Sequence, residues 1–381
     1  MQSRGHHPSA VNAKDLEIKN EPLTVRLRAQ IERAGPMRFR DWIQAALYDE
    51  SDGYYCRPGQ VRQGRTGDYR TAPETSPLFA ATFASYFSKL FAQLGSPPTW
   101  TIFEAGAGSG EFAHGVLKTL KDFYPQVFSA TSYVIDEISP ATRQRAQARL
   151  AEFDERVTFQ RLSEIDQPAE AGICFSNELI DALPVHRVIM RDGELRELCV
   201  GLSGEEFVWV EGEPSEQVAE YCSRIGLRLS EGQIAEVNLD AEEYISRAAR
   251  LFDRGFLITV DYGAERSELL DSPDRFEGTL RAFRRHQLIQ NVLGSPGEQD
   301  LTTTVDWTQI KEAGRRAGLR ATSLQRLDQF LLSEGLTVLS ELLSHTADGA
   351  EALRLSTSVR EMIMPTGMAA SFQVLVQEKS P

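Results

Sequence analysis

Short apolar runs alternate with segments of helical spacing through the central part of this 381-residue chain. A short apolar run has the length of a buried strand, and apolar residues that recur every three or four positions predict an amphipathic helix. We therefore expect strands at 99–104, 132–137, 157–160, 172–176 and 256–261, and helices at 111–124, 140–153 and 240–253. Strands alternating with helices are typical of an α/β fold with a doubly wound, mostly parallel sheet.

The segments before and after this region have their own patterns. Residues 21–45 show helical spacing interrupted at Gly35-Pro36, and a further helix is expected at about 78–94. Between them, residues 48–77 are rich in Gly, Pro and aromatic residues, which predicts an ordered loop rather than a disordered linker. Towards the C-terminus we expect helices at 306–317 and about 328–362, and strands at 319–327 and 371–378.

Two stretches interrupt the alternation of strands and helices. Residues 185–211 predict an antiparallel meander with a hairpin turn at Asp192-Gly193, a helix is expected at 215–225, and residues 263–304 form a long polar insertion. The predicted organisation is a disordered tail at 1–20, an N-terminal cap at 21–95 and a larger domain at 96–381. Insertions into that domain are expected at about 185–254 and 263–304.

The composition of the chain indicates which kinds of partner and which cellular location to expect. The chain carries 41 Lys and Arg against 55 Asp and Glu, a net charge of −14, which repels phosphate backbones and argues against nucleic acid. No apolar run approaches the ~20 residues that cross a bilayer, so membrane insertion is not expected. The first twenty residues lack an apolar signal region and contain acidic residues, and the four cysteines are scattered. We therefore expect a reduced, cytoplasmic protein, and its oligomeric state stays open.

A glycine turn lies between the first central strand and the next helix, where an open α/β sheet builds a nucleotide site. Its sequence is Glu104-Ala-Gly106-Ala-Gly108-Ser-Gly110-Glu111. The glycine spacing is GxGxG, whereas the dinucleotide fingerprint is GxGxxG, and two carboxylates flank the turn. Carboxylates suit the cationic ammonium and sulfonium of S-adenosylmethionine (SAM) better than an anionic pyrophosphate. SAM is favoured over NAD, and a turn that only packs helix against strand is the third alternative.

Polar residues also follow the next strands, at the edge of the sheet where ligands bind. The second strand ends in Asp136-Glu137, and a carboxylate here can accept hydrogen bonds from both ribose hydroxyls. The fourth strand runs into residues 176–184 (SNELIDALP), so that Asn177 is expected to face the cofactor.

Glu178 and Asp181 follow in the same segment. Two carboxylates three positions apart can hold a guanidinium in a bidentate fork and increase the nucleophilicity of one nitrogen. Capping of a helix is the alternative for this pair. Asp261, at the end of the fifth strand, is favoured slightly as a substrate contact over a loop anchor.

Four sequence blocks carry a resemblance to a known family. They are residues 46–55 (ALYDESDGYY) with 67–79 (GDYRTAPETSPLF), 104–110 (EAGAGSG), 176–185 (SNELIDALPV), and 278–286 (GTLRAFRRH) with 296–302 (PGEQDLT). In these blocks the sequence resembles the MidA-like (DUF185) methyltransferases, which include the mitochondrial complex I assembly factor that methylates arginine.

The resemblance implies a Rossmann-like class I SAM-dependent methyltransferase fold with an N-terminal helical and loop cap and inserted segments. It also implies protein arginine N-methylation, to symmetric dimethylarginine in the mitochondrial relative. The implied partner is a protein substrate, such as a respiratory complex I subunit or its bacterial equivalent.

The site residues follow from this interpretation. Glu178 and Asp181 are the predicted catalytic pair; the predicted cofactor residues are Glu104, Gly106, Gly108, Gly110, Glu137, Asn177, Asp68, Thr71 and Pro73. The last three belong to residues 48–79, which are expected to lie over the cofactor crevice, and no metal is required. Two alternatives remain: a SAM-binding assembly factor without turnover, and an NAD-dependent oxidoreductase.

Overall fold

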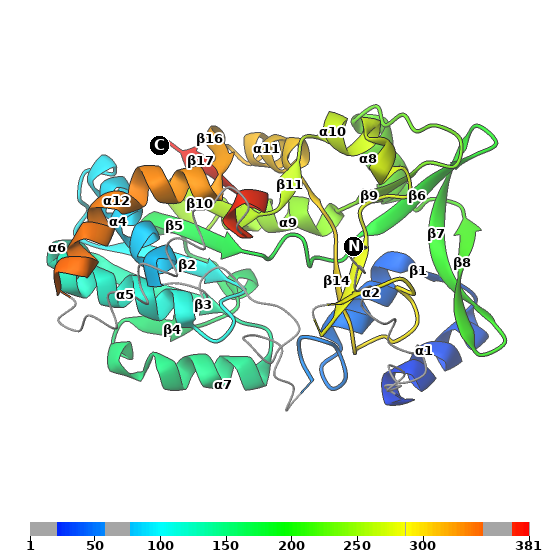
Figure 1. The fold of residues 1–381 in the computed structure, drawn as a ribbon, viewed down its shortest axis with the longest axis horizontal. Helices are drawn as coiled ribbons and strands as arrows, with labels where there is room; N and C mark the ends of the chain where they lie inside the picture. Colours follow the sequence, from blue (N-terminus) through cyan, green and yellow to red (C-terminus); the bar gives the residue numbers. More distant parts are fainter. Residues whose placement is uncertain (1–20, 58–76, 286, 346–367, 381) are drawn as a thin grey trace, which may run out of the picture.

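The computed structural model describes residues 21–57, 77–285, 287–345 and 368–380 (Figure 1). Several predictions from the sequence fall outside these ranges. They are the disordered tail at 1–20, the C-terminal part of the helical region expected at 328–362, and three cofactor residues, Asp68, Thr71 and Pro73.

A seven-stranded sheet forms the centre of the larger lobe (Figure 1, left). Its order is β16-β17-β10-β5-β2-β3-β4, and all neighbouring pairs are parallel except those of β17, which is antiparallel to β10 and β16. The strands are β2 (Trp100–Ala105), β3 (Thr131–Asp136), β4 (Val157–Phe159), β5 (Ala169–Asn177), β10 (Phe252–Asp261), β16 (Arg320–Arg326) and β17 (Gln373–Lys379). The chain turns from one side of β2 to the other between β4 and β5, which opens a crevice at the carboxyl ends of β2 and β5. The predicted doubly wound, mostly parallel sheet is confirmed.

Helices cover both faces of this sheet. One face packs against α4 (Pro77–Gln93), α5 (Glu111–Phe123) and α12 (Leu327–His345), with Phe112 stacked on Phe175 of β5 at 4.1 Å. The other face packs against α9 (Leu239–Ala248) and α11 (Trp307–Arg316). The sequence assigned α4 to the cap, but α4 packs against α5 and α12 in the core of the larger lobe.

The cap without α4, residues 185–237 of the first insertion and much of the second insertion form a second lobe (Figure 1, right), whereas α9, which was expected within the first insertion, packs on the large sheet. Its main sheet has the order β1-β7-β6-β9, with β8 paired to β7. The elements of this sheet and its helices are α1 (Glu21–Ala34), β1 (Met37–Arg38), α2 (Phe39–Tyr48), β6 (His186–Arg191), β7 (Glu194–Ser203), β8 (Glu206–Gly212), α8 (Glu216–Arg224) and β9 (Ile234–Val237). One apolar core joins Trp42 of α2, Val200 of β7 and Leu301, so the cap and both insertions fold against one another.

The second insertion, expected as a polar segment, contains regular structure. It holds β11 (Gly263–Ala264), α10 (Arg266–Asp271), β12 (Arg281–Arg284), β13 (Gln287–Ile289) and β14 (Asp300–Thr302), and β11 pairs with β15 (Val305–Asp306). β12 lies between β13 and β14 in an antiparallel sheet. The strands are too short to give an alternating pattern in sequence, which is why the pattern indicated only a polar stretch.

Two boundaries differ from the expected ones for physical reasons. The helix expected at 240–253 ends at Ala248, because Phe252 already pairs with Ala169 of β5 and belongs to β10. A helix that was not expected, α6 (Pro125–Ala130), begins at Pro125 just after α5 ends at Phe123, since proline is favoured in the first helical turn. The remaining helix and short 3-10 turns are α7 (Pro140–Arg149), η2 (Ala151–Phe153), η3 (Leu162–Glu164), η4 (Pro273–Arg275) and η5 (Met368–Ser371).

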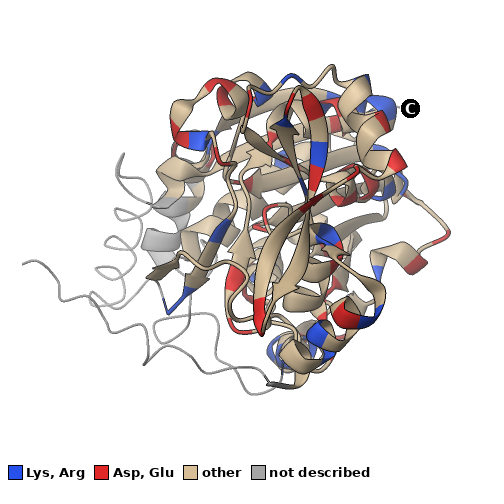
Figure 2. Ribbon diagram, turned by 90° about the vertical axis from the view of Figure 1, so that its right-hand side faces the viewer, with Lys and Arg blue, Asp and Glu red and all other residues tan. Residues whose placement is uncertain are grey.

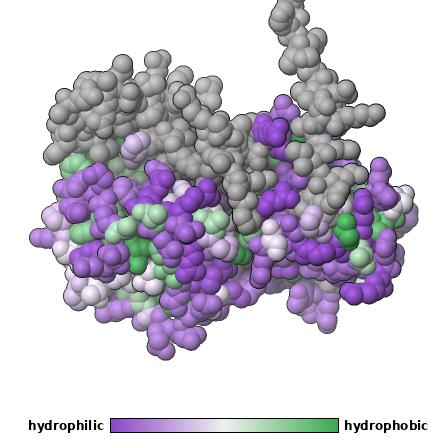
Figure 3. Space-filling view, turned by 90° about the horizontal axis from the view of Figure 1, so that it is seen from below, coloured by the Kyte–Doolittle hydropathy of each residue, from purple (hydrophilic) through white to green (hydrophobic). Residues whose placement is uncertain are grey.

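The described surface is polar and of mixed charge. Figure 2 shows acidic and basic residues interspersed on the second lobe, where Arg191 pairs with Glu211 at 2.6 Å. The face in Figure 3 is mostly hydrophilic where it is not grey, and the exposed large apolar residues of the described chain, such as Val25 and Leu288, lie on separate elements. In the described ranges no helix has both the length and the apolar character needed to span a bilayer.

We expect Gly255→Ala to destabilise the sheet. Gly255 faces Gly172 in the β10–β5 ladder, with φ of +151°, and a Cβ there would lie 1.9 Å from the Gly172 carbonyl oxygen. The strands must separate to admit it, which should lower the free energy of unfolding by about 2–4 kcal/mol in urea denaturation. Gly212→Ala in β8 is the matched control, since its Cβ would meet Cys199 Sγ at an ordinary 3.6 Å. Equal stability of the two variants would contradict the close approach of β5 and β10.

Candidate functional site

The carboxyl ends of β2, β3 and β5 border a cavity of about 360 Å³. Residues that line it come from the glycine turn, the end of β3, the loop after β4, the loop after β5, α9 and α2; among them are Gly106, Asp136, Leu162, Leu179, Tyr244 and Tyr48. This volume is within the range of small-molecule and cofactor sites. Within the described residues, no three His, Cys, Asp or Glu side chains gather as metal ligands would.

The glycine turn shapes one end of this cavity. Positive φ angles, between +55° and +76°, are found at Gly106, Gly108 and Gly110, and residues that carry a side chain rarely adopt them. Gly106 lines the cavity, and its N–H donates to the Asp136 carbonyl at 2.8 Å. Gly110 is the N-cap residue of α5, and a Cβ there would lie 3.1 Å from Ala146 Cβ of α7, so the absence of a side chain allows the two helices to pack closely.

The two acidic residues that flank the turn differ in position. Glu104 is buried in β2 and accepts a hydrogen bond from the Tyr133 hydroxyl at 2.6 Å. Burial raises the pKa of Glu104 to about 8, partly opposed by that hydrogen bond. Glu111 pairs with Arg149 of α7. Neither carboxyl group is among the residues that line the cavity, so the assignment of Glu104 to the cofactor stays a prediction.

The acidic pair at the end of β3 divides its contacts between two loops. Glu137 accepts hydrogen bonds from Gly108 N at 2.9 Å and Ser139 N at 2.7 Å, and burial raises its pKa to about 7. Asp136 lines the cavity, accepts from Leu162 N at 3.0 Å, and lies 3.1 Å from the Arg161 guanidinium. The assignment of the ribose to Glu137 stays a prediction, and Asp136 is the acid that faces the cavity.

The loop after β5, residues 178–184, is here called the acceptor loop. No helix begins in this loop, so Glu178 and Asp181 do not cap a helix, and the helix-capping alternative is wrong. Glu178 has φ of +51°, a strained value for a non-glycine residue, and its carboxylate accepts from Asn177 Nδ2 at 3.0 Å. The Asn177 Oδ1 atom is buried with no hydrogen-bond partner in the structure. A buried amide oxygen of this kind requires a donor, which a ligand or a water can supply.

Asp181 is the buried member of the predicted catalytic pair. Its side chain is 5% exposed, and burial raises its pKa to about 6, opposed by a hydrogen bond with Tyr262. Its Oδ1 atom has no hydrogen-bond partner in the structure. A buried carboxylate oxygen of this kind costs free energy unless a donor reaches it, so it fits a cationic ligand.

Asp261 anchors the acceptor loop. It is fully buried at the end of β10, and its Oδ2 accepts from Ile180 N at 3.0 Å and Asp181 N at 3.2 Å. Its Oδ1 accepts from Tyr262 N at 2.9 Å. Burial first, and then the charge of Asp181, raise the pKa of Asp261. The sequence favoured a substrate contact here, but both oxygens are used by backbone N–H groups, and the loop-anchor alternative is the correct one.

The structure also brings in residues that the sequence did not single out. Tyr48, the last residue of α2, lines the cavity and donates to the Ala182 carbonyl of the acceptor loop at 2.9 Å. Tyr262 lies beside Asp181. Both stand in polar, aromatic segments that the sequence had noted, but only the fold shows that these segments meet at the site.

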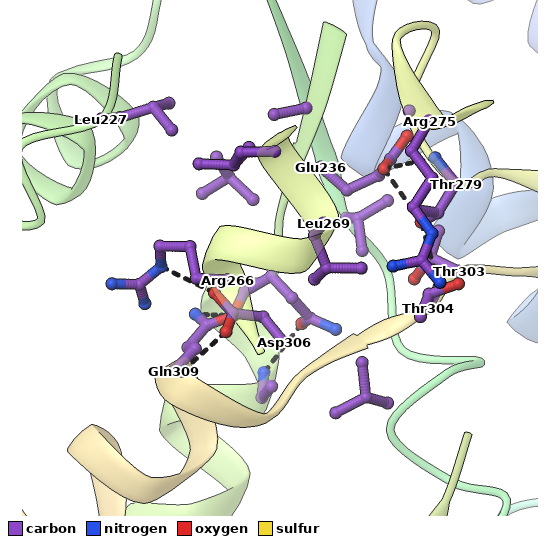
Figure 4. Close-up of a pocket in the computed structure, with 18 of the residues that line it drawn as sticks. Leu227, Glu236, Arg266, Leu269, Arg275, Thr279, Thr303, Thr304, Asp306 and Gln309 are labelled. Carbon is purple, nitrogen blue, oxygen red and sulfur yellow. Dashed lines mark hydrogen bonds and ion pairs between the residues drawn. The ribbon is translucent and has the colours of Figure 1, made fainter. Parts of the chain in front are cut away.

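A second, smaller cavity of about 50 Å³ lies between α9, α10, β9 and the start of α11 (Figure 4). Its charged groups are paired: Glu236 accepts from Thr279 N at 2.8 Å, and Arg266 pairs with Asp306 at 2.8 Å. Asp306 also caps α11 through Gln309 N. This cavity has room for a few waters and lies where the two lobes pack against each other.

Known proteins resemble the chain over nearly its whole length. A COG1565 superfamily member from Burkholderia thailandensis, in a structure bound to S-adenosyl-homocysteine, has a TM-score of 0.81 and 28% identity, covering 97% of this chain and 95% of its own. The protein arginine methyltransferase NDUFAF7 homolog, mitochondrial, of Drosophila melanogaster is 27% identical, covering 93% of this chain and 84% of its own length. Its Danio rerio relative is 25% identical, covering 93% and 86%.

Family membership rests on a match over more than half of the chain. Residues 82–325 match the family described as "Putative S-adenosyl-L-methionine-dependent methyltransferase". This stretch contains the glycine turn, the acceptor loop and the 296–302 block. The predicted SAM cofactor and class I methyltransferase fold are thereby confirmed, and the NAD alternative falls. The chain belongs to this family of SAM-dependent methyltransferases.

Proposed function

We propose that the protein transfers methyl groups from SAM to arginine side chains of a protein substrate. The observation that carries this proposal is the acceptor loop. This loop carries a buried carboxylate with an unpartnered oxygen, Asp181, between Leu179 and Leu183, which line the cavity. The relatives named protein arginine methyltransferases support the same substrate class. Following the family resemblance, the product is symmetric dimethylarginine, and the target is a respiratory complex I subunit or its bacterial equivalent.

In this proposal the residues of the site have two roles, cofactor binding and substrate binding. SAM supplies an electrophilic methyl group on a sulfonium centre. We infer that the cofactor is received by Gly106, which lines the cavity, by the buried amide oxygen of Asn177, and by the carboxyl group of Glu104 at the end of β2. Glu178 and Asp181 hold the target guanidinium by charge-assisted hydrogen bonds and localise its charge away from the reacting nitrogen.

Positioning supplies most of the rate in a direct displacement. Aligned reactants can gain roughly 7–11 kcal/mol. Asp261 fixes the backbone of Ile180 and Asp181, so the carboxylate is oriented before substrate arrives. As the new N–C bond forms, Asp181 can accept the proton that the nitrogen releases, since a pKa near 6 is suitable for a base at neutral pH.

The test is detection of methylarginine. The purified protein is incubated with methyl-labelled SAM and an extract of cells that lack it, and the labelled proteins are hydrolysed to amino acids. Label in symmetric dimethylarginine supports the proposal. Label in another amino acid changes the substrate class, and no labelled protein despite SAM binding favours the assembly factor without turnover.

The curated relatives are named as mitochondrial, and a cytoplasmic location of this chain stays a prediction.

The acceptor-loop carboxylates should be needed for transfer and not for cofactor binding. We expect Glu178→Gln and Asp181→Asn each to lower the rate of methyl transfer on the order of 10²-fold, because each removes a charge from the guanidinium site. The affinity for SAM, measured by calorimetry, should stay within about threefold. Asp253→Asn, at an exposed position in β10, is the control. Full transfer by both variants would show that the loop has another role.

The affinity for SAM should depend on pH through Glu104. Burial raises the pKa of Glu104 to about 8, so the carboxyl is mostly protonated at pH 6 and must lose its proton to pair with the ammonium group of SAM. Affinity should therefore increase with pH from 6 to 8, by up to about tenfold per unit well below the pKa. Glu104→Gln should bind more weakly at pH 8 and flatten the dependence in calorimetry. The same pH dependence in variant and wild type would make Glu104 a structural residue.

A further inference from the structure

Two helices from different lobes contribute to the wall of the 360 Å³ cavity, α2 of the cap and α9 of the larger lobe. Gln44 and Tyr48 line the cavity from α2, and five residues line it from α9: Asp240, Glu243, Tyr244, Arg247 and Ala248. Residues four positions apart lie on the same face of a helix, so Gln44 and Tyr48 are neighbours on the side of α2 that meets the cavity. A cap helix is therefore part of the cavity in which we expect SAM to bind.

The position of Gln44 is fixed by contacts one helical turn away on either side. Arg40, one turn before it, donates to both carboxylate oxygens of Asp240 in α9, at 3.2 and 2.7 Å. Tyr48, one turn after it, donates to the Ala182 carbonyl oxygen of the acceptor loop at 2.9 Å. The helix is thus attached to the larger lobe on both sides of Gln44, and the amide is held at the cavity before a ligand enters.

Gln44 also differs in charge from the other long polar residues of the cavity. Each charged residue that lines the cavity has an oppositely charged partner: Asp240 pairs with Arg40, Glu243 with Arg247, and Asp136 with Arg161. Gln44 is neutral and half-buried, and in the part of the chain that the structure describes its amide has no hydrogen-bond partner. Paired charges beside an unused amide favour a neutral ligand group that both donates and accepts hydrogen bonds.

The adenine base is the neutral part of SAM, whereas the methionine part carries an ammonium, a carboxylate and the sulfonium. Four apolar residues, Ile138, Leu162, Leu179 and Leu183, line the same cavity and suit the faces of a flat ring. The edge of adenine has the 6-amino donor next to a ring-nitrogen acceptor. A glutamine amide offers the complementary acceptor and donor, which is how glutamine and asparagine recognise adenine in DNA.

We propose that Gln44, on the cap helix α2, recognises the edge of the adenine base, with its amide oxygen accepting a hydrogen bond from the 6-amino group. This inference concerns the cofactor, so it stands whether or not the methyl acceptor is arginine. It makes cofactor recognition a joint property of the two lobes, because the larger lobe supplies the glycine turn and the cap supplies the group that selects the base.

The test compares two ligands by calorimetry: S-adenosyl-homocysteine, and its analogue with purine in place of adenine, which lacks the 6-amino group. The wild-type chain should bind S-adenosyl-homocysteine about three- to tenfold more tightly than the analogue, because the analogue leaves the Gln44 oxygen without a donor. Gln44→Leu keeps a side chain of similar size and helix propensity but removes the amide. It should bind S-adenosyl-homocysteine about three- to tenfold more weakly than the wild type, and should bind both ligands equally within about twofold.

Two controls separate recognition of the base from an effect on folding. Gln30→Leu, the same substitution at an exposed position of α1 in the cap, should behave as the wild type towards both ligands. The urea midpoint of Gln44→Leu should match that of the wild-type chain. Equal binding of the two ligands by the wild type overturns the inference, and so does wild-type affinity for S-adenosyl-homocysteine in folded Gln44→Leu. If Gln44→Leu binds weakly but keeps the wild-type preference between the ligands, another group recognises the 6-amino group and the inference is wrong.

Discussion

The fully buried carboxylate of Asp261 is the constraint on which the geometry of the site depends. It ends β10 and accepts three backbone N–H groups, two of them from the acceptor loop that follows the neighbouring strand β5. A buried carboxylate costs free energy unless it is hydrogen-bonded. Moving the loop away would leave the Asp261 carboxylate buried without these donors, so the loop is held in place. Because β5 and β10 are parallel neighbours, the anchor also fixes Asp181 and Tyr262 side by side at the same edge.

A second consequence concerns the lobe made by the cap and the insertions. Its elements come from three separate parts of the chain, yet they share one apolar core. The cap places Tyr48 at the cavity and in contact with Ala182 of the acceptor loop, and its Tyr55 donates to Asp300 of the second insertion. The lobe therefore borders the cavity of the methyltransferase domain through the last turn of α2.

The sequence predicted the central sheet well, because apolar runs and helical spacing are local properties. It predicted the glycine turn and the acceptor loop for the same reason: both directly follow strands whose ends must meet. It could not show that Asp261 would turn its oxygens to backbone N–H groups, since an acid at a strand end is equally compatible with substrate binding. Nor could it show that Tyr55 reaches Asp300, 245 positions away, because that contact depends on the packing of two insertions.

The protonation of the site follows from its burial. Glu104, Glu137 and Asp181 have pKa values raised to about 8, 7 and 6, in each case mainly because burial disfavours the charged form. Repulsion adds to burial at two of these groups: Glu137 raises the pKa of Glu104, and Asp136 raises that of Glu137. A cation placed among them reverses the balance, lowers each pKa and releases protons. A site of this design therefore discriminates by charge at both ends: it favours a cationic cofactor at the glycine turn and a cationic side chain at the acceptor loop, and it disfavours anions at either position.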